Sequence, residues 1–161
     1  MDIFDFALQM ERDGEEYYRD LAQRCNEAGL RSILNMLAND EAKHYGIIQE
    51  MKRGRGSGMA ETEVLVNAKN IFARMKEEGA TSYLKISHGE LYEKAKEIER
   101  VSQEFYTEKA EKVLEEHQKE IFLQLAEEEK QHLVLLENII EFISRPRQWI
   151  ENAEFHHLDE Y

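Results

Sequence analysis

"NDEAKHYG" (residues 39–46) is the stretch from which the fold can be worked out, because it places a carboxylate and an imidazole on an apolar helical face. Apolar side chains recur at steps of three and four residues on both sides of it, as in an amphipathic helix. These side chains are Leu30, Ile33, Leu34, Leu37, Ile48 and Met51. Glu41 and His44 fall on the same face. A buried carboxylate without a partner costs several kcal/mol, so the rest of the chain must supply partners.

A second copy of this pattern lies 88 residues further along the chain, which is the difference between positions 41 and 129. At this offset "LNMLANDEAKHYGII" aligns with "FLQLAEEEKQHLVLL", and Glu41 falls on Glu129. His44 falls on His132 in the same alignment. A single Glu-x-x-His is weak evidence for a site, because motif matches carry false positives. Two of them at one repeat offset are much stronger evidence.

The same offset also relates the segments that precede these two motifs in each half of the chain. "MERDGEEYYRDLA" aligns with "IERVSQEFYTEKA", which places Glu11 on Glu99 and Tyr18 on Tyr106. Each Glu-x-x-His begins 30 residues after a glutamate in the apolar stripe, as the positions 11 and 41, and 99 and 129, show. The two halves therefore look like copies of one helical hairpin joined by a long crossover.

Helical periodicity covers most of the chain, and no segment shows the sustained alternation of a strand. The expected long helices cover about residues 3–26, 30–53, 87–116 and 118–144, and a shorter helix lies in the crossover within residues 61–78. Asp2 is the expected N-cap of the first helix, and Ser87 has capping-box spacing to Glu90. Gly29 is expected in the first turn between helices. The sequence predicts an all-α domain over residues 1–145 and a tail over residues 146–161.

Composition restricts the classes of partner. The formal net charge is −13, which disfavours nucleic acid and anionic membranes and favours metal cations. The single cysteine excludes an internal disulfide and a four-cysteine metal site within these 161 residues. The N-terminal stretch lacks the pattern of a signal peptide, and no apolar run is long enough to span a bilayer. We therefore expect a cytoplasmic protein.

The six polar residues on the apolar stripes predict a metal site. Four carboxylates and two neutral imidazoles balance the charge of two divalent cations, and mixed oxygen and nitrogen ligands suit Fe or Mn, with Zn as a competitor. Residues three apart lie on one face of a helix, so a glutamate and a histidine of one motif can serve the same ion. The candidate ligands are Glu11, Glu41, His44, Glu99, Glu129 and His132.

Roles follow from the repeat, and some alternatives stay open. We expect Glu41 and Glu129 to bridge two ions, with the other two glutamates as terminal ligands. Glu15 is the main rival ligand, but glutamine stands at its repeat position. Tyr18 and Tyr106 each lie two helical turns after a candidate ligand. They are either plain core tyrosines or catalytic helpers that donate hydrogen bonds to the ligand carboxylates.

The motif phrases "MERDGEEYY", "NDEAKHYG", "EIERVSQEFY" and "EEEKQHLV" resemble those of the ferritin-like superfamily, and the rubrerythrin group most closely. The resemblance covers residues 3–144. It implies an antiparallel four-helix bundle with one long crossover and a carboxylate-bridged di-iron centre. Rubrerythrins tend to carry a further glutamate three residues after the third-helix ligand, where this sequence has Ser102.

The resemblance also implies a function. We expect a non-haem di-iron oxidoreductase that reduces peroxide or dioxygen, oxidises Fe(II), or does both. Full-length rubrerythrins carry a four-cysteine rubredoxin domain, so electrons are expected from an external donor such as a rubredoxin-like protein. A homodimer is the expected assembly, with no nucleic-acid or membrane partner. The alternatives are a ferritin-like iron-storage protein and a metal-stabilised bundle with a binding role.

Overall fold

The computed structural model describes residues 2–55, 62–78 and 89–144. The elements are α1 (Ile3–Arg24), α2 (Ala28–Lys52), α3 (Val64–Glu78), α4 (Gly89–Ala110) and α5 (Glu116–Ser144). No strand occurs within the described ranges, so the predicted all-α class is confirmed. The expected tail and the Ser87 cap lie outside the described residues.

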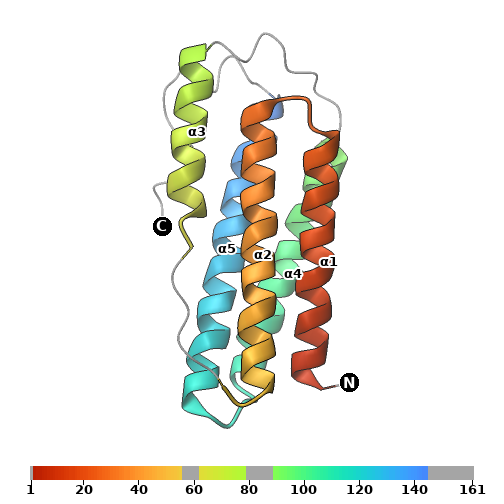
Figure 1. The fold of residues 1–161 in the computed structure, drawn as a ribbon, viewed down its shortest axis with the longest axis vertical. Coiled ribbons are helices and arrows are strands. Elements are labelled where there is room, and N and C mark those ends of the chain that lie inside the picture. Colours follow the sequence, from red (N-terminus) through yellow and green to blue (C-terminus); the bar gives the residue numbers. More distant parts are fainter. Residues whose placement is uncertain (1, 56–61, 79–88, 145–161) are drawn as a thin grey trace.

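The bundle consists of two antiparallel hairpins, α1–α2 and α4–α5, packed side by side (Figure 1). α2 ends at one end of the bundle and α4 begins at the other, so the crossover has to travel the whole length of the bundle. α3 lies on the outside of the bundle beside the half that contains the α1–α2 turn, where it packs against α2 and α5. This is the predicted four-helix bundle with one long crossover and an extra helix.

The ends of the first hairpin differ slightly from the prediction. α1 begins as expected, since the Asp2 side chain accepts a hydrogen bond from the backbone N–H of Asp5 at 2.8 Å. α2 begins two residues early, because Glu27 caps it by accepting from the backbone N–H of Leu30 at 2.7 Å. Gly29 therefore lies in the first turn of α2, not between the helices. A Cβ there would come within 2.6 Å of Met75 Sδ, so the glycine lets α3 approach α2 closely.

The turn of the second hairpin was predicted wrongly. α4 ends at Ala110, about six residues before the expected end near residue 116, and α5 already begins at Glu116. Residues 111–115 contain neither glycine nor proline, so no local signal marks this turn. The chain reverses there because α5 must run antiparallel to α4 and bury its apolar face. One consequence is that the apolar side chain of Leu114 is fully exposed in the turn.

The core is divided into two apolar clusters by a polar layer halfway along the bundle. The cluster nearer the α1–α2 turn contains Leu34, Leu37 and the inner face of α3, and the other contains Ile48 and Phe122. Along every bundle helix, the candidate ligands lie between residues of these two clusters. The apolar clusters thus close the polar layer from both ends. None of the helices in the described part of the chain has the length and apolarity needed to cross a membrane.

The docking of α3 can be tested at Phe72, which is buried and whose ring lies 5.6 Å from that of Phe142. We expect Phe72→Ala to lower the free energy of unfolding by about 3–5 kcal/mol, because it leaves a cavity between α3 and the bundle. Urea denaturation measures this change. Val66→Ala, on the exposed side of the same helix, is the control and should change stability by less than about 0.5 kcal/mol. Equal effects of both changes would contradict the packing described.

Candidate metal centre

All four bundle helices contribute to the polar layer, and the structure brings together every candidate metal ligand predicted from the sequence. α1 and α4 each supply one glutamate, while α2 and α5 each supply a glutamate and a histidine one turn further on. Each of the six residues is at most 3% exposed. The six are Glu11, Glu41, His44, Glu99, Glu129 and His132.

The six residues form two overlapping groups of four, each with ligand atoms that lie within 4.8 Å of one another. The first group is Glu11, Glu41, His44 and Glu129, and the second is Glu41, Glu99, Glu129 and His132. Only Glu41 and Glu129 belong to both groups. The two groups are therefore adjacent candidate metal sites that share a pair of carboxylates, the arrangement that the sequence repeat predicts for bridging ligands.

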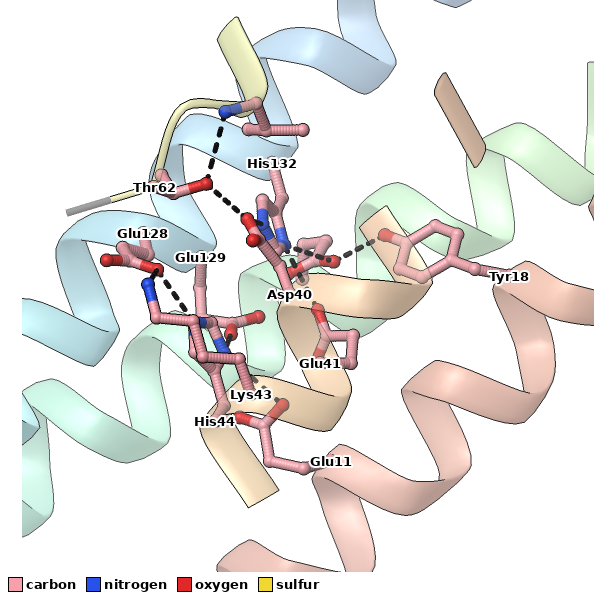
Figure 2. A network of polar contacts seen from close by, with 12 residues as sticks. Glu11, Tyr18, Asp40, Glu41, Lys43, His44, Thr62, Glu128, Glu129 and His132 are labelled. Carbon is pink, nitrogen blue, oxygen red and sulfur yellow. Dashed lines mark hydrogen bonds and ion pairs between the residues drawn. The ribbon is translucent and has the colours of Figure 1, made fainter. Parts of the chain in front are cut away.

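Both histidines point towards the carboxylates of the candidate ligands, and in both the nearest ring atom is Nδ1 (Figure 2). His132 Nδ1 lies 3.0 Å from Glu41 Oε1 and 3.2 Å from Glu99 Oε1. His44 Nδ1 lies 2.9 Å from Glu129 Oε1 and 3.4 Å from Glu11 Oε2, at ion-pair distance but without the alignment of a hydrogen bond. Nδ1 is thus the atom that each histidine would offer to a metal.

The opposite ring atoms reach two carboxylates that our sequence reasoning missed. His44 Nε2 lies 2.8 Å from Glu128 Oε1, and His132 Nε2 lies 2.9 Å from Asp40 Oδ2. These carboxylates directly precede Glu41 and Glu129 and are themselves related by the repeat offset, a signal that could have been read from the sequence. A carboxylate on Nε2 keeps the proton on that nitrogen and leaves Nδ1 free to bind metal.

The two tyrosines cross from one hairpin to the other. The Tyr18 hydroxyl on α1 donates a hydrogen bond to Glu99 on α4, and the Tyr106 hydroxyl on α4 donates to Glu11 on α1 at 2.5 Å. Burial, together with the neighbouring carboxylates, raises the pKa of both phenols well above its usual value. Each tyrosine therefore keeps its proton and holds the carboxylate of the opposite hairpin in place.

The rival ligand Glu15 belongs to neither of the two groups. It is half-buried and its carboxylate forms an ion pair with Arg19 at 3.0 Å. Gly14, one turn after Glu11, has a more direct effect on the site. A Cβ at this glycine would come within 3.2 Å of Glu41 Oε2, so its absence makes room for the shared carboxylate.

Protons balance the charge of the centre when no metal is bound. Burial and then the neighbouring glutamates raise the pKa of Glu41 and Glu129 well above the usual value. Burial opposes the ionisation of Glu11 and Glu99 too, but the adjacent histidines outweigh it and lower the pKa of both. Burial likewise opposes charge on the histidines, whose pKa is nevertheless raised well above its usual value, for His44 mainly by Glu11 and for His132 mainly by Glu99.

Several buried atoms of these residues have no hydrogen-bond partner, namely Glu11 Oε2, His44 Nδ1, Glu99 Oε2 and Glu129 Oε1. Buried polar atoms without partners are rare and costly in folded proteins. Oxygen and imidazole nitrogen are ligand atoms for Fe and Mn, and two divalent ions would neutralise the four carboxylates. The donor set and its orphaned atoms therefore fit two metal ions.

Comparisons with known proteins agree with this geometry. The protein-family model described as Rubrerythrin matches residues 2–140, which is most of the chain and includes every residue of the polar layer. No curated protein and no solved structure matches the chain.

The protonation pattern predicts how the stability of the metal-free protein depends on pH. The raised pKa of the two histidines means that the folded state holds protons which the unfolded state, with the ordinary value of 6.5, has released. Glu41 and Glu129 act in the same direction above their ordinary value of 4.5. The free energy of unfolding should therefore fall as pH rises above 6.5. Urea denaturation at a series of pH values measures this, and stability that rises over the same range would contradict it.

Asp40 and Glu128 can be tested by removing their charge. We expect Asp40→Asn and Glu128→Gln each to weaken Co(II) binding by about 10- to 100-fold, because a neutral amide is a poorer partner for the histidine N–H. Competition against a chelator measures the affinity. Glu15→Gln, which removes a carboxylate from the same bundle but outside the centre, should leave it unchanged. An equal loss in all three variants would mean that overall charge, and not the histidine contact, controls binding.

Proposed function

The chain belongs to the rubrerythrin family, and from this premise we propose that its buried centre holds two iron ions and works as a non-haem di-iron oxidoreductase. The proposed reactions are the reduction of peroxide or dioxygen and the oxidation of Fe(II). The observation that carries the proposal is the pair of overlapping four-residue groups that share Glu41 and Glu129.

The charges of the layer support two ions. With four ionised carboxylates and two neutral histidines, two divalent cations give a neutral centre. In the metal-free protein the same balance requires protons on Glu41, Glu129, His44 and His132. Metal ions would therefore take the place of these four protons, because the six ligand residues include no lysine or arginine that could balance the carboxylates.

Two irons, when bound, supply the two electrons needed to reduce peroxide and the Lewis acidity that polarises its oxygens. The protein residues prepare the site for this chemistry. The shared carboxylates keep both positions together, and Tyr18 and Tyr106 fix the terminal carboxylates while keeping their own protons. The apolar clusters above and below exclude water from the layer.

The electrons for repeated turnover need a donor. The one cysteine of these 161 residues does not make a four-cysteine iron site. We propose that a separate electron carrier, such as a rubredoxin-like protein, reduces the centre.

Anaerobic loading with Fe(II) followed by mixing with peroxide tests the proposal. We expect two irons per chain and an oxidation much faster than that of free Fe(II), with one peroxide consumed for each pair of irons. Glu41→Ala should abolish the paired stoichiometry, because Glu41 belongs to both groups. Glu15→Gln is the control and should behave like the parent protein.

Two results would overturn the proposal. One is the binding of fewer than two irons per chain, and the other is bound iron that reacts no faster than iron in solution. Solution mass separates this function from iron storage, because a storage cage needs a large assembly and a small oligomer rules one out.

A further inference from the structure

Each histidine contacts a carboxylate through Nε2, and the two halves of the centre differ in the side chain that this carboxylate contacts in turn. Lys43 Nζ lies 4.0 Å from Glu128 Oε1, the oxygen that contacts His44. Asp40 instead accepts a hydrogen bond from the Thr62 hydroxyl, with the same oxygen that contacts His132. Figure 2 shows the two arrangements on either side of the ligand residues.

Within residues 2–55, 62–78 and 89–144, neither contact has a copy in the other half. At the repeat offset of 88, the difference between Glu41 and Glu129, Lys43 corresponds to the uncharged Gln131. Thr62 belongs to the crossover, just before α3, where its oxygen also accepts from the backbone N–H of Val64 at 3.2 Å. The crossover thus places a neutral hydroxyl against the carboxylate partner of His132. α2 itself places an ammonium group near the carboxylate partner of His44.

The difference in charge should change how strongly each histidine binds metal. A carboxylate on the far nitrogen makes a histidine a better ligand. Lys43 neutralises part of the charge of Glu128, so His44 receives less of this support than His132 receives from Asp40. Lys43 also repels a cation at the His44 position. Its side chain is 31% exposed, so solvent screens part of the effect.

The tyrosine contacts of the two halves are alike. Each terminal glutamate accepts one tyrosine hydroxyl, Glu11 from Tyr106 and Glu99 from Tyr18. Lys96 on α4 is as exposed as Lys43, but its partners Glu93 and Glu137 are solvent-exposed carboxylates outside the centre. Among the residues that the structure describes, the pair of Lys43 and Glu128 is therefore a charge next to a histidine partner that only one half has.

We propose that Lys43 is a positioning residue that makes the two metal positions unequal, so that the group with His132 fills first and the group with His44 holds the more exchangeable ion. This inference rests on the proposed two-metal centre. It deepens that function by giving the centre a fixed order of loading, set by one residue that contacts no metal.

Substoichiometric loading tests the order. Metal-free protein is given one Co(II) per chain, crystallised, and the occupancy of each position is measured by anomalous scattering at the cobalt edge. We expect the His132 position to bind Co(II) about three- to tenfold more tightly, less than the roughly 10- to 100-fold effect of losing a direct histidine partner. Lys43→Gln, which installs the residue of the other half, should bring the occupancies together. Lys43→Arg keeps the charge and should keep the difference.

Lys96→Gln is the matched control, since Lys96 has the same side-chain exposure of 31% but contacts no histidine partner. It should leave the occupancy ratio unchanged. Equal occupancies in the parent protein, an unchanged ratio in Lys43→Gln, or an equal change in Lys96→Gln would each overturn the inference. Absence of Co(II) from both positions would instead overturn the metal centre itself, so the two failures are distinguishable.

Discussion

The structure depends on one electrostatic constraint, which is the need to neutralise the four candidate-ligand glutamates buried in one layer of a helical bundle. Four isolated charges of this kind would cost an amount comparable to the about 5–15 kcal/mol by which proteins of this size are stable. Protons meet the constraint when metal is absent, and in the proposed function divalent cations would meet it instead. Because both solutions would leave the six candidate ligands without net charge, the apolar clusters on either side could pack against them in either state.

The same constraint makes the two hairpins dependent on each other. Each hairpin supplies ligands and also the groups that hold the ligands of its partner. Tyr18 and Asp40 of the first hairpin contact Glu99 and His132 of the second, and the second hairpin returns equivalent contacts. A single hairpin has half of the ligands and none of their supports, so the centre exists only in the complete bundle.

The near-symmetry of the centre is broken by features that the repeat does not contain. The crossover carries Thr62 into contact with Asp40, and α2 carries Lys43 where α5 has a glutamine. The connection between the two hairpins is therefore also part of the surroundings of the site. In a di-metal centre with identical halves, nothing in the protein would distinguish one ion from the other.

The sequence by itself determined the helices, the repeat and the six candidate ligands, because helical periodicity and a constant offset are local or pairwise patterns. Even a carboxylate on an apolar stripe, such as Glu41, is visible without a structure. Tertiary structure alone decided which hairpin supports which ligand, because the donor to Glu99 is far away in the sequence, on α1. It also decided the end of α4 at Ala110, where no glycine or proline marks the turn and the packing of α5 sets the reversal. The roles of Asp40 and Glu128 lie between these cases: their repeat spacing was present in the sequence, but only the folded bundle shows that each one reaches the histidine of the other half.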